Sequence, residues 1–333
     1  MSLHRAILAT PSDDVFDALQ NIALQNGFDV DRTRDAMLGN APLGLVSIAV
    51  SGVRTQIDFD ATTPAELQLL KDIYAQRFSK LGLGSDIEWS APASTVPLNQ
   101  VMCEVHACEQ ISPNFCRMRL TGDFSSFARP DTGLHFRFLF GPADAPPPYL
   151  DENGLTQWPG GLERWHRPVY TVRRQSAEAD WIDVDIVLHA GGRVTDWCSH
   201  VTIGDRIAIN GPTASKRPTA SRLVLLGDET AMPVILRILE GVPENSEARA
   251  VIALRDVDDA QSIKSSENVD LRWIDMAKPQ GLLDCIPPLQ PVADQFIFFA
   301  AERAQAASAR ALLKASDLPA SAYKAAAYWT REE

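Results

Sequence analysis

Cysteine, histidine and long apolar runs are all scarce in this sequence, and each scarcity excludes a class of protein. The five cysteines are an odd number without a CxxC pair, so they do not indicate a disulfide framework. Cys103 and Cys108 have the spacing that begins a plant-type iron–sulfur pattern, but position 111 is isoleucine and the pattern stops there. We therefore expect reduced thiols, mostly buried or half-buried, and no metal site.

Several other motifs and a positive charge balance are missing too. The six histidines form no HExxH motif, and neither a Walker motif nor a Ser-His-Asp order is present, which disfavours metal hydrolases and NTPases. Lysine and arginine total 31 against 43 acidic residues, a net charge of -12 that disfavours nucleic-acid binding. No run approaches the roughly 20 apolar residues of a membrane span, and the N-terminus does not resemble a secretory signal. We expect a cytoplasmic protein without a membrane span; a monomer and a homodimer are both compatible with the sequence.

The 333 residues are too many for one ordinary core, and their apolar patterns divide them into three segments. Residues 1–92 predict a small α+β domain in the order strand, helix, hairpin, helix. Its helices are expected over 12–26 and 63–81, the second capped by Thr63, and its hairpin over 43–59. Residues 90–97 read as a proline-containing linker.

The second and third segments differ in the period of their apolar residues. Residues 98–218 contain short strand-like runs between turn residues, which predicts an antiparallel β-barrel. Its strands are expected over 101–106, 116–121, 135–140, 169–173, 181–189 and 206–209, and the polar stretch 141–167 as a surface loop beside a site. Residues 219–333 alternate strands and helices, which predicts an α/β domain with a parallel sheet. Its strands are expected over 223–226, 250–254, 269–274 and 295–300, and its helices over 231–240 and 303–315.

The residues from 167 to 174, Arg-Pro-Val-Tyr-Thr-Val-Arg-Arg, have the side chains that a flavin site needs. A flavin binds against an aromatic plane, with a hydrogen-bonding group near N5 and cations at its diphosphate. Tyr170, Thr171 and Arg173 supply these three types of side chain. An edge strand with arginines for solubility would account for the same residues.

Two strand-to-helix turns are candidate phosphate sites. In the run 185–197 a strand ends at Gly191-Gly192 and a helix begins near Thr195. The run 226–233 lies at the carboxyl end of the first parallel strand, where open α/β sheets bind ligands. Neither run is a GxGxxG fingerprint. An ordinary strand-to-helix turn or a capped helix start also explains each of them, and a lone histidine such as His189 is commonly structural.

Taken in order, these segments resemble the siderophore-interacting proteins, which are flavin-dependent ferric-siderophore reductases related to the ferredoxin-reductase superfamily. The resemblance covers roughly residues 98–333 and implies an FAD-binding barrel over 98–218 and an NAD(P)H-binding α/β domain over 219–333. The matching pieces are 170–173, 185–189, 192–197, Gly204-Asp205, Gly211-Pro212, 227–233 and Tyr328-Trp329.

The resemblance also implies roles for individual residues. It places Tyr170 against the isoalloxazine and Thr171 near N5. The FAD contacts that it implies are Arg167, Tyr170, Thr171, Val172, Arg173, Asp185, His189, Gly192, Val194, Thr195, Trp197 and Trp329. The NAD(P)H contacts are Gly227, Asp228, Glu229, Thr230 and Glu302. The family pattern has arginine two residues before the tyrosine, where this chain has Val169, so Arg173 or Arg174 is expected to replace Arg167 at the phosphates.

The implied reaction passes electrons from NADPH or NADH through FAD to Fe(III) in a siderophore, whose hard oxygen ligands hold Fe(II) less tightly. An anionic siderophore would need a basic rim, for which Lys216, Arg217 and Arg303 are candidates; each is also explained as a solvated surface charge. A flavin or ferredoxin-type reductase with a protein partner, and a non-catalytic siderophore-binding protein, are the alternatives. The first 90 residues resemble a small domain of unknown function sometimes fused to such reductases, interpreted here as a packing or dimerisation module.

Overall fold

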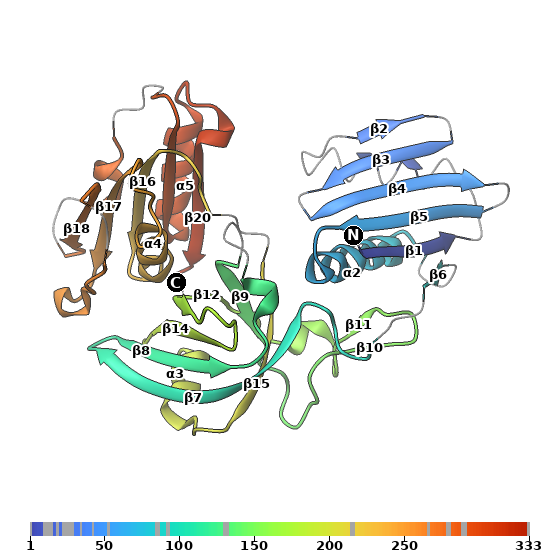
Figure 1. Cartoon of the computed structure of the whole chain (residues 1–333), viewed down its shortest axis with the longest axis horizontal. Coiled ribbons are helices and arrows are strands. Elements are labelled where there is room, and N and C mark those ends of the chain that lie inside the picture. Colours follow the sequence, from blue (N-terminus) through green and yellow to red (C-terminus); the bar gives the residue numbers. More distant parts are fainter. Residues whose placement is uncertain are drawn as a thin grey trace. The chain divides into compact units, whose positions relative to one another are not determined.

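The structure is a computed structural model of the whole chain (Figure 1). It describes residues 2–8, 16–17, 20–21, 30–33, 35–41, 43–51, 54–83, 87–90, 94–128, 133–213, 217–264, 267–277, 281–287 and 292–331. Contacts divide the chain into two compact units, each assembled from separate stretches. The first unit contains Met1–Met102, Phe136–Val169 and Ile207–Ala214, and the second contains Cys103–His135, Tyr170–Arg206 and Ser215–Glu333.

The N-terminal part forms a six-stranded sheet with the order β2-β3-β4-β5-β1-β6. The predicted hairpin is present, because β4 and β5 pair antiparallel up to Ser51 and Arg54. Strands β2, β3 and β6 were not predicted; β3 reads Ala-Met-Leu-Gly-Asn-Ala, in which alanine, glycine and asparagine are poor strand formers. Most of the helix predicted over 12–26 lies outside the described residues. The strands are β1 Ser2–Leu8, β2 Val30–Arg32, β3 Ala36–Ala41, β4 Gly44–Ser51, β5 Arg54–Ala61 and β6 Ile87–Trp89.

Helix α2, Pro64–Lys80, covers this sheet and begins where the sequence predicted. The Thr63 hydroxyl accepts the Glu66 N–H at 3.1 Å, and the Glu66 carboxylate accepts the Thr63 N–H at 3.1 Å. This reciprocal cap contributes on the order of 1 kcal/mol. The apolar face of the helix, including Leu70 and Phe78, is buried in one cluster with Phe59 of β5. The helix therefore closes the core of the N-terminal sheet.

The stretch 141–167 was predicted as a surface loop, and this prediction is wrong in part. It forms a short hairpin of β10, Tyr149–Leu150, and β11, Thr156–Gln157, and its Trp165 is buried against Leu139 and Ala208. The ammonium of Lys71 in α2 donates to the Asn153 carbonyl at 2.7 Å. This segment thus packs on its neighbours through a tryptophan side chain and a backbone carbonyl, although its composition is polar.

A seven-stranded sheet follows, with the order β12-β9-β15-β7-β8-β14-β13. The pairs β7–β8, β8–β14, β13–β14 and β9–β15 are antiparallel, as the sequence predicted for this part of the chain. Of the strand predicted over 169–173, only residues 169–171 form a strand, β12; residues 172–173 lie between β12 and β13. The strands are β7 Gln100–Ser112, β8 Phe115–Thr121, β9 His135–Phe138, β12 Val169–Thr171, β13 Arg174–Gln175, β14 Trp181–Val187 and β15 Arg206–Asn210, and helix α3, Arg193–His200, follows β14.

The C-terminal part is a five-stranded parallel sheet with the order β18-β17-β16-β19-β20; Figure 1 labels β16, β17, β18 and β20. The order reverses between β16 and β19, which makes the carboxyl end of this strand pair the topological switch point. Strand β20 was not predicted. The strands of this sheet are β16 Arg222–Asp228, β17 Glu247–Leu254, β18 Val269–Asp275, β19 Gln295–Glu302 and β20 Tyr323–Trp329. The helices of this part are α4 Met232–Leu239 and α5 Arg303–Lys314. Among the helices that the structure describes, none is long and apolar enough to cross a membrane.

Candidate functional site

The switch point of the parallel sheet brings two elements unusually close at Gly227. A Cβ atom on this residue would lie 2.6 Å from the Cβ of Ala231 at the start of α4 and 2.9 Å from the carbonyl oxygen of Ala300 in β19. No side chain fits there, so the glycine allows the strand, the turn and the helix to pack tightly. The turn after β16 therefore has a fixed backbone path.

Asp228, the last residue of β16, joins the ends of three strands. One carboxylate oxygen accepts the N–H and the hydroxyl of Thr230 at 2.9 and 2.5 Å. The other accepts the N–H of Glu302 at 3.1 Å and Nε1–H of Trp329 at 2.7 Å. Four predicted site residues thus lie together at the ends of β16, β19 and β20. Trp329, predicted as an FAD contact, is bonded to a residue predicted for the nucleotide.

The two glutamates predicted at this edge also bond to backbone groups. Glu229 is buried, accepts the N–H of Arg255 at 3.0 Å and forms an ion pair with the Arg255 guanidinium. Burial raises the pKa of Glu229 above its ordinary value, and the hydrogen bonds and charge of Arg255 oppose the rise. Glu302 caps α5 by accepting the N–H of Ala304 at 2.6 Å. The Glu229 and Glu302 side chains therefore hold the backbone at Arg255 and Ala304, next to the ends of the parallel strands.

His135, the first residue of β9, is a polar residue that the sequence reading overlooked. Its Nε2 lies 3.0 Å from the hydroxyl of Tyr328 in β20, and the two rings meet edge to face. Its Nδ1 is buried and finds no partner among the described residues. Burial lowers the pKa of His135 to about 4, with the charges of Lys324 and Arg237 acting in the same direction. The imidazole is therefore neutral at pH 7.

This depressed pKa predicts a specific pH dependence of stability. The unfolded state binds the proton near pH 6.5 and the folded state only near pH 4, so the free energy of unfolding falls as the pH falls through this window. The loss attributable to His135 is roughly 3 kcal/mol. We expect His135→Gln to flatten the profile of urea unfolding between these pH values. His106→Gln, which replaces an exposed histidine, is the control, and equal profiles for His135→Gln and the parent would contradict the assignment.

The turn between β14 and α3 presents a helix N-terminus without a capping side chain. Gly191 has a positive φ of 74°, and the cap residue Gly192 begins the helix. A Cβ atom on Gly192 would lie 2.6 Å from Cε1 of His189 and 3.0 Å from the Thr195 hydroxyl, which itself accepts the N–H of His189 at 3.1 Å. Three predicted FAD contacts, His189, Gly192 and Thr195, therefore shape one turn, whose backbone can approach a ligand closely. Val194 is buried beneath the turn and Trp197 is half-buried one turn later.

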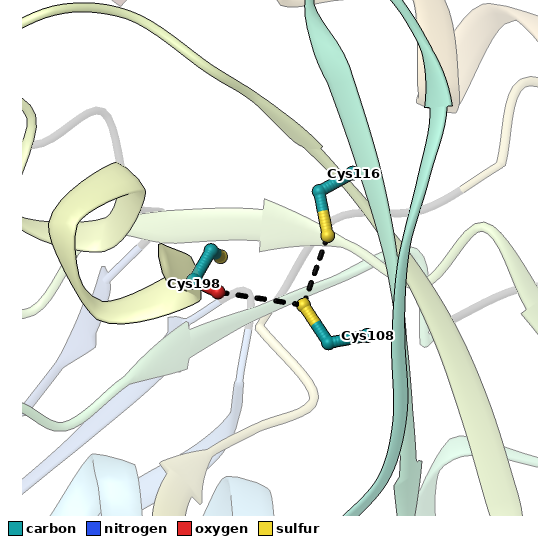
Figure 2. Close-up of side chains that lie close together, drawn as sticks. All are labelled: Cys108, Cys116 and Cys198. Carbon is teal, nitrogen blue, oxygen red and sulfur yellow. Dashed lines mark hydrogen bonds between the residues drawn. The ribbon is translucent and has the colours of Figure 1, made fainter. Parts of the chain in front are cut away.

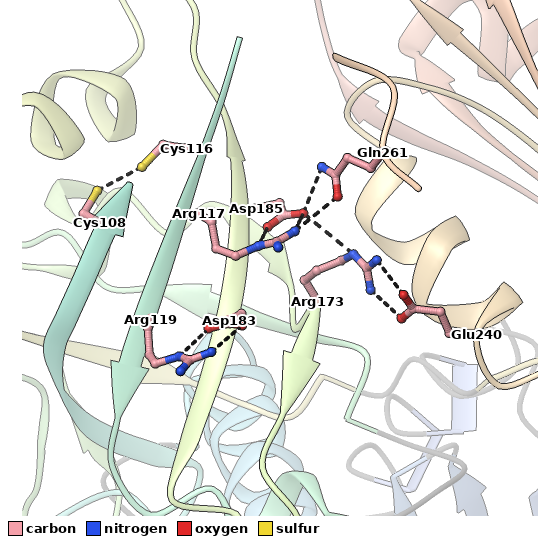
Figure 3. A network of polar contacts seen from close by, with 9 residues as sticks. All are labelled: Cys108, Cys116, Arg117, Arg119, Arg173, Asp183, Asp185, Glu240 and Gln261. Carbon is pink, nitrogen blue, oxygen red and sulfur yellow. Dashed lines mark hydrogen bonds and ion pairs between the residues drawn. The ribbon is translucent and has the colours of Figure 1, made fainter. Parts of the chain in front are cut away.

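The strand that carries Tyr170 is more buried than its alternation predicts. Tyr170 is half-buried and burial raises its pKa, whereas Thr171, Val172 and Arg173 are all buried. The Arg173 guanidinium donates to both carboxylate oxygens of Glu240 at 2.6 and 2.8 Å, and its Nε lies 3.7 Å from Asp185 (Figure 3). Its donors therefore point at two protein carboxylates, the buried Asp185 and the partly exposed Glu240.

Two arginines of β8 face two aspartates of β14 in register. Arg117 pairs with Asp185 at 2.7 and 2.8 Å, and Arg119 pairs with Asp183 at 2.8 and 2.9 Å, each through two hydrogen bonds. Gln261 also donates to Asp185 at 3.1 Å (Figure 3). Asp185, predicted as an FAD contact, is thus enclosed by protein donors. The Arg-x-Arg and Asp-x-Asp spacings were visible in the sequence as same-face charges on two strands.

The remaining predicted cations lie in different surroundings. The Arg167 guanidinium lies 5.0 Å from the Trp158 ring centroid. Arg217 is half-buried against Gly241, where burial lowers its pKa. Arg303 is exposed at the start of α5, and Lys216 lies outside the described residues. The sequence reading also missed Arg237, which donates to the carbonyls of Gly133 and Val172 at 2.8 and 2.7 Å.

Comparison with known proteins agrees with this architecture at the level of fold. The fold, an antiparallel sheet followed by a parallel α/β sheet, resembles that of solved ferredoxin reductases. A solved ferredoxin reductase of carbazole 1,9a-dioxygenase superposes with a TM-score of 0.50 at 14% identity, covering 72% of this chain and 71% of that one. A siderophore utilization protein from T. fusca superposes with a TM-score of 0.60 at 24% identity, covering 73% and 97%.

Family models identify the chain more closely. Residues 104–216 match the siderophore-interacting FAD-binding domain, and residues 220–332 match the siderophore-interacting protein model. The chain therefore belongs to the siderophore-interacting protein family, as the sequence predicted. Among curated relatives, the ferric vibriobactin reductase ViuB of Vibrio cholerae is 28% identical over 176 residues, which are 49% of this chain and 62% of the relative. The match thus spans less than two thirds of that relative's length.

Proposed function

We propose that this protein is an FAD-containing reductase that takes electrons from NADPH or NADH and reduces ferric siderophores to release Fe(II). The observation that carries the proposal is the order of the two family models, which fall on the antiparallel and the parallel sheet in turn. The relative named a ferric vibriobactin reductase supports the choice of a ferric siderophore as acceptor.

The turn before α3 fits the diphosphate of FAD. No side chain caps the helix that begins after Gly192, and the positive end of the helix favours phosphate there. We assign His189, Gly192, Val194, Thr195 and Trp197 to this part of the cofactor. Arg173 would have to leave Glu240 to reach a phosphate, so Arg167 and Arg174 are the better cations for that role.

Tyr170 and Thr171 would hold the flavin ring, the tyrosine by its plane and the threonine by its hydroxyl. When bound, FAD would accept a hydride from the nicotinamide and pass single electrons to Fe(III). The protein's own task is to position the ring and exclude water. Val172, Arg173 and Asp185 are all buried, so we propose that they support the backbone that carries Tyr170 and Thr171.

The nicotinamide nucleotide is proposed to bind at the switch point of the parallel sheet. Gly227 and Asp228 set the backbone of the turn, Glu229 and Thr230 extend it, and Glu302 fixes the start of α5. We accordingly propose an FAD domain over 98–218 and a nucleotide domain over 219–333; the ends of the family models at 216 and 220 support this division. Residues 1–92 are proposed to be a packing or dimerisation module.

The siderophore is proposed to meet a basic rim. We propose that this rim consists of Arg303, which is exposed, and of Lys216 and Arg217, which come before β16 in the sequence. The net charge of -12 repels an anionic chelate, and a local positive charge of this kind would raise the rate at which the chelate meets the protein.

The proposal is tested by anaerobic reduction followed by an acceptor panel. We expect a yellow protein that is bleached by NADPH or NADH and reoxidised by ferric siderophores in a stopped-flow instrument. Reoxidation by ferredoxin alone would favour a reductase with a protein partner. A protein that binds ferric siderophore but takes up no FAD would be a binding protein, and the proposed function would be wrong.

Replacing Tyr170 tests the flavin strand. Tyr170→Ala removes the aromatic plane and is expected to weaken FAD binding about 10- to 100-fold, since stacking and burial of such a ring contribute about 1.5–3 kcal/mol. Tyr170→Phe keeps the plane and should retain the cofactor. The measurement is the FAD content per chain after gel filtration, and full retention by Tyr170→Ala would refute the assigned contact.

A further inference from the structure

Three cysteines that are far apart in the sequence meet at one point of the second unit. Cys108 lies in β7, Cys116 in β8 and Cys198 in α3, and their sulfur atoms all lie within 4.8 Å of one another (Figure 2). The sulfurs of Cys108 and Cys116 are 2.9 Å apart, and the Cys108 sulfur lies 3.9 Å from the carbonyl oxygen of Cys198. Cys116 is buried, and the other two are half-buried.

The fold itself produces this meeting. Strands β7 and β8 pair antiparallel, with Cys108 opposite Met118 and Gln110 opposite Cys116, so the two cysteines lie diagonally across the pair. A register shift between Gln110 and Ser112 lies beside them. Helix α3 adds the third thiol from outside the strand pair (Figure 2). Three separate backbone elements thus direct one sulfur each to a common centre, as structural metal sites do.

The spacing of the sulfurs suits a metal ion better than it suits a disulfide. Metal–sulfur bonds of about 2.3 Å in a tetrahedron place ligand sulfurs about 3.7 Å apart. The observed separations, from 2.9 Å to within 4.8 Å, bracket this value. A disulfide requires about 2.0 Å and would leave the third thiol unused. We propose that Cys108, Cys116 and Cys198 form a three-thiolate site for a soft metal ion, Zn²⁺ or Cu⁺.

The chemistry of the donors selects the ion. Thiolates favour Zn²⁺ and Cu⁺, and the Irving–Williams order places Fe²⁺ below zinc. Binding exchanges the three thiol protons for the metal, and a water or the Cys198 carbonyl can complete the coordination. The half-buried cysteines give the ion a path from solvent.

The site has a structural consequence for α3. Cys198 is the sixth residue of this helix, whose N-cap is Gly192 and whose first turn contains Val194 and Thr195. A metal that joins Cys198 to β7 and β8 would anchor the helix to the antiparallel sheet. Because a ligand that binds only the folded state stabilises it, zinc should raise the melting temperature of the whole chain. This inference does not depend on the proposed reductase activity.

Zinc binding to the full-length protein is the direct test. Metal-free protein reduced with a phosphine is titrated with zinc chloride against a chromophoric chelator, and copper(I) is titrated likewise under anaerobic conditions. We expect one ion per chain, and at least tenfold weaker binding by Cys108→Ser, Cys116→Ser and Cys198→Ser. Cys285→Ser removes a half-buried cysteine outside the cluster and should bind like the parent. Tighter binding in the zinc or the copper arm identifies the ion.

A second measurement keeps the test valid if a variant does not fold. Cobalt(II) added to the parent protein should give an intense sulfur-to-metal charge-transfer band, whose strength reports the number of bound thiolates. Absence of binding by all three metals, unchanged affinity in Cys198→Ser, or a Cys108–Cys116 disulfide in the purified protein that excludes metal would each overturn the proposal.

Discussion

Asp185→Asn is expected to lower the free energy of unfolding by about 3–5 kcal/mol, because it removes one charge from a buried ion-pair network. The Asp185 side chain is 0% exposed, is bonded to Arg117 at 2.7 and 2.8 Å, and lies 3.7 Å from Nε of Arg173, whose side chain is also 0% exposed. Asparagine keeps the shape and removes the charge, so Arg173 is left with Glu240 as its one remaining carboxylate in the network. Urea unfolding followed by circular dichroism measures the loss.

Asp183→Asn is the matched control. It lies two residues away on the same strand and makes the same two-bond contact with an arginine of β8. Its partner Arg119 is 38% exposed and can turn to water when the carboxylate is lost. We expect a loss of about 1 kcal/mol or less. Equal losses for the two variants would show that burial of the partner does not set the cost.

Asp228→Asn is expected to slow the reduction of bound flavin by NADPH or NADH at least tenfold while the FAD content stays unchanged. The carboxylate accepts four hydrogen bonds that tie the turn after β16 to the ends of β19 and β20. The amide nitrogen of asparagine would face the donors of Glu302 and Trp329, a conflict that costs about 2–4 kcal/mol for two charge-assisted bonds. We expect the substitution to displace the turn after β16, which is proposed to bind the nucleotide, and so to slow hydride transfer to the flavin.

Stopped-flow reduction and a flavin absorbance ratio distinguish this effect from general unfolding. Asp256→Asn provides the control, because Asp256 caps the loop after the neighbouring strand β17 by accepting the N–H of Asp258 at 3.0 Å. This variant should reduce normally. If Asp228→Asn also reduces at the parent rate, the nucleotide binds elsewhere on the protein, although the structural role of Asp228 would stand.

Elements with strong local signals were predictable from the sequence. Helix α2 has a capping residue, a proline in its first turn and an apolar face, and it begins where expected. The buried runs of β16, β17 and β19 were recognised because apolar residues are consecutive there. Strand β20 escaped detection because Tyr-Lys-Ala-Ala-Ala-Tyr-Trp contains four good helix formers in a row. Pairing with β19 overrides that local preference.

The sequence by itself determined the order of a mixed N-terminal part, an antiparallel sheet and a parallel α/β sheet, and the position of Gly227 and Asp228 at the end of a strand. These follow from periodicity and turn chemistry, which act over a few residues. Only the tertiary structure decided which partners the charged and sulfur-containing side chains meet. Arg173 bonds to Glu240, 67 positions away, and Cys108 lies beside Cys116 and the far more distant Cys198. Such contacts depend on strand register and helix docking, and the few cysteines that first excluded a disulfide framework acquire a site only when β7, β8 and α3 come together.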